Sequence, residues 1–287
     1  MKIGIIGAGR VGTSIGRYIK DRVSKHIVSG FYSRTYNEAI KSANFCNTEA
    51  FDRLQDLIKS SDTLFITVTD SEIKNVWDCI DKDLVNNKII CHFSGALSSD
   101  VFTGADDYGV YTGSIHPVYA FSSKFDSYKG LNKAVFTAEG DNVFLQNIPC
   151  LFSEIGNKVC VIKKEKKPFY HAGASMASNH LVALLHTVIE MFKECGFSEP
   201  DAYTVLAPLM MDNLNNALKN GVNQALTGPI ERGDVTTIEK HLSVISDEQK
   251  KTYKSLGIQV LSIAENKNKS NEILAEKYRC IERMLLE

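Results

Sequence analysis

Apolar runs of strand length alternate with segments of helical spacing through the first half of the chain. The apolar runs lie at residues 3–6, 26–32, 63–68 and 88–93. The helical segments lie at residues 11–20, at 37–43 and from Asp70 onward. This alternation predicts a parallel sheet with helices on both faces. Shorter apolar runs extend the predicted sheet at residues 110–115, 134–138 and 158–162.

The pattern changes after the charged segment 163–168. Residues 169–195 have the spacing of one long apolar helix, and further helices follow with almost no strand signal. We therefore expect a fold of the α/β class. It has an N-terminal Rossmann domain over residues 1–165, with a doubly wound parallel sheet, and an all-α domain over residues 166–287. The active site of such a fold is expected in the cleft at the carboxyl ends of the strands.

The first predicted strand is followed by Gly7, Gly9 and Gly12 in GxGxxG spacing. Gly7 allows a tight turn, Gly9 lets the backbone approach a pyrophosphate, and Gly12 lets the next helix pack close to the sheet. The N-terminus of that helix presents free N–H groups and a positive dipole end to phosphates. The residues expected to bind a dinucleotide here are Gly7, Ala8, Gly9, Arg10, Val11 and Gly12.

The end of the second predicted strand indicates which dinucleotide binds. An NAD enzyme carries an Asp or Glu there, which binds the ribose hydroxyls. This chain has Ser33, Arg34 and Thr35 instead. A guanidinium binds phosphate in a fork and stacks on adenine, so these residues favour a 2′-phosphate. The expected cofactor is NADP.

Other candidate residues follow the later strands. Thr67 and Thr69 end the fourth and are expected to line the nicotinamide side of the cleft. Ser94 and Gly95 follow the fifth, where small residues let the cofactor ring approach. His116 precedes a proline, which holds it in an extended conformation, and it is a candidate catalytic residue unless it is only a turn residue.

The long helix carries a polar stripe. His171, Ser175 and Ser178 are spaced four and three residues apart on one face, with Asn179 at its edge. Buried polar groups cost about 2 kcal/mol or more unless they are paired. The stripe therefore faces a cleft or is tied into hydrogen bonds, and bonding between helices is the alternative, most of all for Ser175.

A loop around Gly228 and Pro229 interrupts the helical half. Arg232 in this loop offers a fork for a substrate carboxylate, with Thr227 beside it. The alternative is that Arg232 pairs on the surface with Glu231 or Asp234.

Composition excludes several classes of partner. The chain has 33 basic and 34 acidic residues, so no uniform field draws it to nucleic acid or to anionic lipid. Its uninterrupted apolar runs are strand-length, and the helix at 169–195 carries too many polar residues to span a membrane. No signal-peptide pattern occurs, so we expect no membrane partner and a cytoplasmic protein. The seven cysteines show no metal-ligand spacing and are expected to be reduced core residues, with no metal bound.

Several motifs together resemble one family. They are Gly7-Ala-Gly-Arg-Val-Gly12, His92-Phe-Ser-Gly-Ala96, Ser114-Ile-His-Pro117, Ala138-Glu-Gly-Asp141, Tyr170-His-Ala-Gly-Ala174 with Ala177-Ser-Asn179, and Leu226-Thr-Gly-Pro-Ile-Glu-Arg-Gly-Asp234. The family is the Rossmann-like oxidoreductases with a C-terminal helical domain of formerly unknown function. It belongs to the wider group of 6-phosphogluconate dehydrogenase, pyrroline-5-carboxylate reductase, prephenate dehydrogenase and ketopantoate reductase, and one branch contains non-classical ketopantoate reductases of pantothenate biosynthesis.

The resemblance implies an NADPH-dependent reductase of a small 2-oxo acid, with ketopantoate (2-dehydropantoate) as the first candidate and a homodimer as the assembly. Related enzymes have a Lys on the long helix four residues before an Asn; here Asn179 fits the Asn, but Ser175 replaces the Lys. The proton donor is then expected to be His171 or His116, the groups able to titrate near pH 7.

In this reading Asn179 and Ser178 orient the substrate, and Ser175, Thr227 and Arg232 bind it. The alternatives are a pyrroline-carboxylate-type imine reductase, a prephenate-like dehydrogenase, and a protein that senses NADP without turnover.

Overall fold

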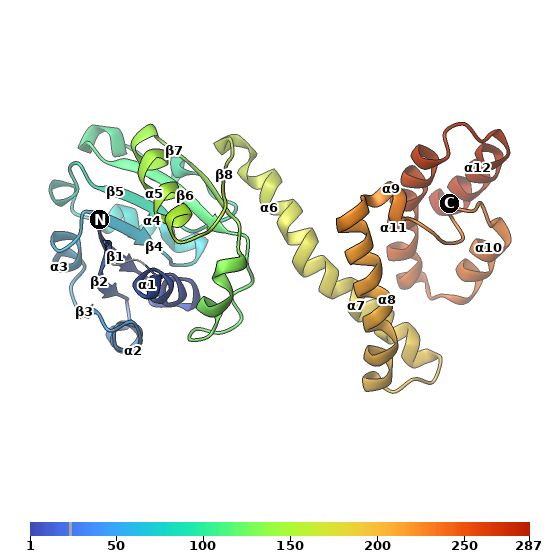
Figure 1. Ribbon diagram of the computed structural model, residues 1–287, viewed down its shortest axis with the longest axis horizontal. Coiled ribbons are helices and arrows are strands. Elements are labelled where there is room, and N and C mark those ends of the chain that lie inside the picture. Colours follow the sequence, from blue (N-terminus) through green and yellow to red (C-terminus); the bar gives the residue numbers. More distant parts are fainter. Residues whose placement is uncertain (23–24) are drawn as a thin grey trace. The chain divides into compact units, whose positions relative to one another are not determined.

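The computed structural model describes residues 1–22 and 25–287. It contains two compact units, Met1–His180 and Leu181–Glu287 (Figure 1). The first unit is built on an eight-stranded sheet, and the described elements of the second are all helical. The predicted fold class, a Rossmann domain followed by helices, is confirmed.

The strand order is β3-β2-β1-β4-β5-β6-β7-β8. The order reverses at β1, which lies between β2 and β4; ligands of doubly wound folds bind at such a point. All pairs from β3 to β6 are parallel, as predicted. The strands are β1 (Lys2–Ile6), β2 (Ile27–Tyr32), β3 (Glu49–Phe51), β4 (Thr63–Ile66), β5 (Ile89–His92), β6 (Tyr111–Pro117), β7 (Phe136–Gly140) and β8 (Val159–Val161).

One pair departs from the predicted parallel arrangement, because β7 runs antiparallel to β6. The segment between them holds a 3₁₀ helix at Ser127–Lys133 and no α-helix that crosses a face of the sheet. Without a crossover helix, the chain turns back at the end of β6, and β7 therefore runs beside β6 in the opposite direction. β8 then pairs parallel with β7, after a helical crossover.

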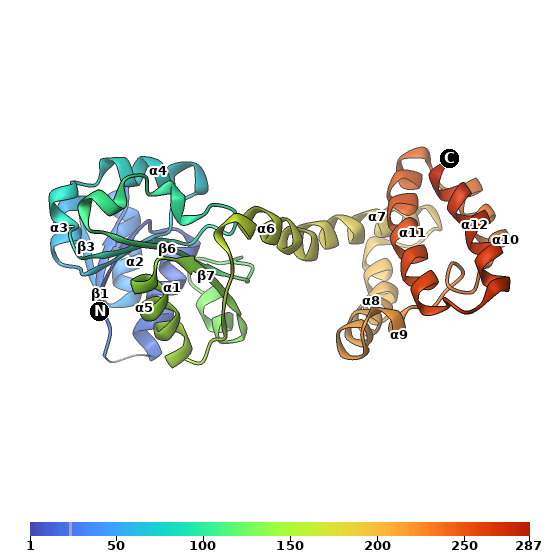
Figure 2. The same ribbon diagram turned by 90° about the horizontal axis from the view of Figure 1, so that it is seen from above.

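Helices cover both faces of the sheet, as Figure 2 shows. Successive side chains on a strand point to opposite faces, so Ile5 packs in one apolar core and Ile6 in the other. The first core includes α1 (Arg10–Arg22), α2 (Tyr36–Cys46) and α5 (Asn142–Glu154); the second includes α3 (Leu54–Lys59) and α4 (Asp70–Cys79). The apolar pattern did not predict α5, although Asp141 caps it by accepting the N–H of Phe144 at 2.9 Å.

The long helical segment is not one regular α-helix. It consists of α6 (Lys167–Ser175), a π-helical turn at Met176–His180 and α7 (Leu181–Glu194). The first unit extends through α6 to His180, beyond the expected boundary at residue 165. The reason is that α6 packs on the sheet: Lys167 is only 1% exposed, and Tyr170 bonds to His116.

The second unit has its own apolar core, around Ile238, Leu261 and Ile281. Side chains cap two of its helices, since Ser198 accepts the N–H of Asp201 and Asp234 accepts that of Thr237. Besides α7, its helices are α8 (Glu199–Asn220), α9 (Val222–Ala225), α10 (Val235–Val244), α11 (Asp247–Lys267) and α12 (Glu272–Leu286).

Within residues 1–22 and 25–287, no helix combines the length and the apolar character needed to cross a membrane. The same residues contain no group of three or more His, Cys, Asp or Glu placed to hold a metal ion. The cysteines are all free, and Cys46 and Cys91 are buried in the core. Cys79, Cys150 and Cys195 are exposed, so the expectation that all seven are core residues is wrong.

Candidate active site

The turn between β1 and α1 has the geometry that a dinucleotide requires. Gly7 has a φ of 108°, where a side chain would be strained. A Cβ atom at Gly12 would overlap the carbonyl oxygen of Gly7 and the hydroxyl of Thr67, so glycine is needed for this close packing. Nothing lies within 4 Å of the Cβ position at Gly9. That open space, beside the N-terminus of α1, suits a pyrophosphate.

A cavity of about 540 Å³ lies at the carboxyl ends of β1, β2 and β4. Most of the predicted cofactor residues line it: Gly7, Ala8, Gly9, Ser33, Arg34, Thr35, Thr67 and Thr69. Arg34 is exposed, and Glu38, the carboxylate nearest to it in sequence, pairs instead with Lys41 and Lys124, both at 2.6 Å. The Arg34 guanidinium is therefore available to a phosphate.

The other predicted cofactor residues do not line this cavity. Arg10 and Val11 open α1, and Nη1 of Arg10 donates to the carbonyl oxygen of Phe121 at 3.3 Å. Ser94 and Gly95 follow β5, the strand beside β4. A dinucleotide extended from β2 across β1 would pass the end of β4 before reaching them.

The turn at residues 94–97 is fixed by polar contacts on several sides. The hydroxyl of Ser94 accepts the N–H groups of positions 96 and 97, at 3.1 and 3.0 Å, and donates to Oδ2 of Asp70 at 2.8 Å. The N–H of Ser94 donates to Nδ1 of His92 at 3.2 Å. Since Asp70 begins α4, the turn after β5 is tied to the helix that follows β4.

His92 is a fully buried, neutral histidine. Its Nδ1 accepts from Ser94, so its Nε2 carries the hydrogen and donates to the carbonyl oxygen of Ser98 at 3.2 Å. Burial, with a smaller contribution from the charge of Lys167, lowers the pKa of His92 to about 3. His92 is therefore part of the scaffold that holds the turn.

Two predicted catalytic histidines, His116 and His171, meet above Gly95. Their ring centroids lie 5.9 Å apart. A Cβ atom at Gly95 would be 2.9 Å from Nε2 of His116 and would overlap the ring of His171. Glycine was expected at position 95 to admit the cofactor ring. In the structure, the two imidazole rings already leave no room for a side chain there. Nδ1 of His116 also shares a hydrogen bond of 2.8 Å with the hydroxyl of Tyr170.

The expectation that His116 titrates near pH 7 is wrong. Burial, then the charges of Lys167 and His171, lower the pKa of His116 to about 4. The ring is neutral at pH 7, where it can donate a hydrogen bond without carrying a charge. Sequence patterns could not reveal this, because the cause is the surroundings of the folded ring.

Below the turn lies a buried polar network centred on Lys167. Its Nζ donates to the carbonyl oxygen of Ser94 at 2.8 Å and to Oγ of Ser114. The Ser114 hydroxyl donates to Oε1 of Glu139 at 2.6 Å, and Ser99 donates its N–H and hydroxyl to the same carboxylate, at 2.9 and 2.8 Å. Lys167 and Glu139 are 1% and 2% exposed, so a serine hydroxyl bridges two buried, opposite charges.

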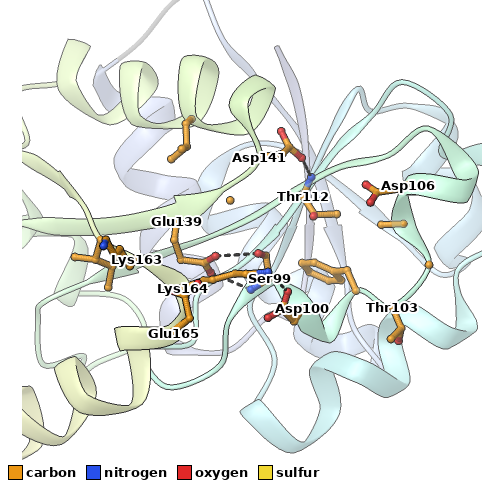
Figure 3. A pocket seen from close by; sticks show the side chains of 16 residues that line it. Ser99, Asp100, Thr103, Asp106, Thr112, Glu139, Asp141, Lys163, Lys164 and Glu165 are labelled. Atoms are coloured by element: carbon orange, nitrogen blue, oxygen red, sulfur yellow. Dashed lines mark hydrogen bonds and ion pairs between the residues drawn. The ribbon is translucent and has the colours of Figure 1, made fainter.

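Figure 3 shows the other side of this network, a polar hollow of about 1040 Å³. Glu139 points from β7 toward Ser99, and Lys164 pairs with Asp100 at 2.7 Å. Of its labelled side chains, Glu139 and Ser99 belong to the Lys167 network, and none hydrogen-bonds to His116 or His171. The hollow is therefore separate from the candidate site.

The rest of the polar stripe lies further along the chain. Ser178 belongs to the π-helical turn and donates to the carbonyl oxygen of Ala174 and to Oδ1 of Asn179, both at 2.9 Å. Ser178 and Asn179 are exposed, whereas His171 and Ser175 are half-buried. π-Helical turns occur frequently at functional sites, and this one holds the predicted orienting pair.

Two predicted substrate-binding residues belong to the second unit. Thr227 lines an apolar cavity of about 340 Å³, together with Pro229, His241 and Tyr253. Arg232 is exposed, and Glu231 pairs with Lys267 at 2.9 Å rather than with Arg232. The structure thus brings His116 and His171 together, and it places Thr227 and Arg232 in a separate compact unit.

Four residues of this site were given no role from the sequence: Asp70, Glu139, Lys167 and Tyr170. Glu139 and Tyr170 do lie within the motifs that resemble the family. Lys167 is the last lysine of a charged segment that marked a domain boundary. The local signal for Lys167 is Pro168, since proline is favoured in the first turn of a helix and places Lys167 at a helix start.

The site and the fold together define a dinucleotide-binding protein in which a pair of histidines and a buried polar network lie in the same compact unit as the cofactor turn. Comparison with known families gives two matches: residues 1–117 match the Rossmann-like domain, and residues 134–260 match the domain of unknown function DUF2520. The chain is thus a Rossmann-like protein with a C-terminal DUF2520 domain, as its motifs indicated.

Solved structures share the fold. A protein of Thermotoga maritima, TM1727, is 25% identical, with a TM-score of 0.65 over 96% of this chain and 99% of that one. A reductive aminase of Aspergillus terreus, solved with NADPH, is 14% identical, with a TM-score of 0.62 over 99% of this chain and 93% of that one. L-aspartate dehydrogenase of Methanocaldococcus jannaschii is 31% identical over 100 residues, and the match spans 34% of this chain and 37% of that enzyme.

Proposed function

We propose that this protein is an NADPH-dependent reductase of a small carbonyl compound, with the 2-oxo acid ketopantoate as the first candidate. The proposal rests on one observation: two features that a reductase needs lie in the same compact unit. They are the cavity lined by the glycine turn and Arg34, and the His116–His171 pair above Gly95. The first suits a 2′-phosphorylated dinucleotide, and the second suits a polar reacting group.

Bound NADPH would supply a hydride to the carbonyl carbon. Negative charge then develops on the carbonyl oxygen, which needs a hydrogen-bond donor and a proton. With Tyr170 donating to Nδ1 of His116, the Nε2–H of His116 can donate to that oxygen. His171 supplies the proton that completes the alcohol, and Asn179 with Ser178 orients the substrate. Ser175, Thr227 and Arg232 remain candidates for binding the substrate.

An imine is the second candidate substrate. Among proteins of this fold are the reductive aminase and a Plasmodium falciparum pyrroline carboxylate reductase solved with NADP. Their likeness supports the fold and the cofactor, while the choice between C=O and C=N depends on the substrate pocket. A prephenate-like dehydrogenase and a protein that only senses NADP are the remaining alternatives.

A screen of NADPH oxidation over ketopantoate, other 2-oxo acids and cyclic imines tests the proposal. We expect turnover with at least one carbonyl substrate, with ketopantoate fastest. Gly9→Asp is the control: the Cβ position is open, so the fold should persist, but a carboxylate would occupy the space for the pyrophosphate. Cofactor binding without turnover of any compound would favour the sensor instead, and turnover of imines alone would favour the second candidate.

A further inference from the structure

The buried ammonium of Lys167 has no role in the reaction as described above, yet it is held in place by specific bonds. Only 1% of the residue is exposed, and removing a lysine from water costs several kcal/mol unless it is paired and hydrogen-bonded. The bonds of Nζ show how this cost is offset. One goes to the backbone of the turn at residues 94–97, and the other goes to Ser114, which leads to Glu139.

We propose that Lys167 is a positioning residue, which fixes the turn at residues 94–97 beneath the histidine pair and so sets the surroundings of His116. The inference rests on the proposed reductase function, because the histidine pair is catalytic only in that function. The NMR experiment below does not depend on turnover. Lys167 does not line the cofactor cavity, and its Nζ bonds to Ser94 and Ser114 rather than to either histidine. It acts through the Ser94 carbonyl and through its charge.

Gly95, in the turn that Lys167 holds, lies against both imidazole rings. Because the rings of His116 and His171 leave no room for a Cβ atom there, a small shift of the turn would displace both imidazoles. The turn is held by His92 at the N–H of Ser94, by Asp70 at its hydroxyl and by Lys167 at its carbonyl oxygen. Lys167 is the contact that reaches the turn from α6, the helix that also carries His171.

Lys167 also acts on His116 through its charge. The titratable groups beside it are Lys167, Tyr170 and His171, all on α6. Glu139 lies on β7, bonded to Ser99 and Ser114, and Asp70 lies on α4, bonded to Ser94. After burial, the positive charge of Lys167 is the larger electrostatic cause that lowers the pKa of His116. Burial also lowers the pKa of Lys167 itself, to about 8, so the ammonium is charged at pH 7.

The test measures the His116 titration directly, by NMR of the imidazole Cε1–H signal in the full-length protein. Lys167→Met alone would leave Glu139 as an unpaired buried charge and could unfold the chain. The main variant is therefore Lys167→Met with Glu139→Gln, which removes both charges. We expect the pKa of His116 to rise by roughly one unit when the Lys167 charge is gone. Lys164→Met is the matched control, because that exposed lysine pairs with Asp100 and should leave His116 unchanged.

Kinetics give a second reading if the wild type reduces a substrate. The double variant should lose roughly tenfold to a hundredfold in kcat with KM for NADPH unchanged, and the acid limb of its kcat profile should move to higher pH. A folded double variant whose His116 titrates as in the wild type overturns the inference. Failure of the wild type to turn over any substrate would contradict the proposed function, but the NMR shift would still decide the role of Lys167.

Discussion

Arg34 should determine the preference for NADPH over NADH. Its guanidinium lines the cofactor cavity, it is exposed, and the nearby Glu38 is already paired with two lysines. Arg34→Ala therefore breaks no ion pair with Glu38 and removes only the contact to the 2′-phosphate. A hydrogen bond to a charged group contributes about 1.5–3 kcal/mol. Every 1.4 kcal/mol is a factor of about ten, so NADPH affinity should fall roughly tenfold to a hundredfold.

The assay is titration of the protein with NADPH and with NADH, followed by the quenching of protein fluorescence or by calorimetry. NADH lacks the 2′-phosphate, so its affinity should not change in the variant. Arg53→Ala is the matched control, because Arg53 is an exposed arginine at the start of α3 that does not line the cavity. Equal losses for NADPH and NADH, or an unchanged affinity for NADPH, would refute the assignment of Arg34.

Three further predictions address the histidines, the response to pH and the assembly. His171→Ala should lower turnover by about 10² to 10⁴ with nearly intact NADPH affinity, measured by steady-state kinetics beside His116→Ala; wild-type turnover in both variants would exclude both residues from proton transfer. The folded-state pKa values of His92 and His116, about 3 and about 4, lie below the ordinary value of 6.5. The unfolded chain therefore binds more protons between these values, and stability that is complete above pH 6.5 is lost as the pH falls toward 4 and then 3. The urea midpoint should be lower at pH 5 than at pH 7.5, and equal midpoints would contradict the burial of these rings. The protein should be a homodimer by light scattering at micromolar concentration, since α8 exposes Leu209, Met211 and Leu218, the last at 77%. Leu218→Glu should weaken that dimer without unfolding the chain, and a monomeric wild type would remove the prediction.

The sequence by itself determined the features that depend on neighbouring residues. Gly7, Gly9 and Gly12 required a turn of one shape, and the structure gives each the conformation or space that its role needs. The placement of Arg34 at the cofactor site could also be predicted from its neighbours in sequence, because Arg34 follows a strand whose end must lie at the cofactor edge of a parallel sheet. Alternating apolar runs fixed the fold class, since a strand or a helix buries its own periodic face.

Tertiary structure decided what depends on residues far apart in the chain. Lys167 bonds to Ser114 and Ser94, which lie 53 and 73 positions away, and no local pattern connects them. The neutral state of His116 likewise comes from burial and from charges on another element. The antiparallel β7 depended on how residues 118–135 return to the sheet. Sequence periodicity describes which face of an element is buried, but a pKa and a buried ion pair are set by the atoms that the fold brings to that face.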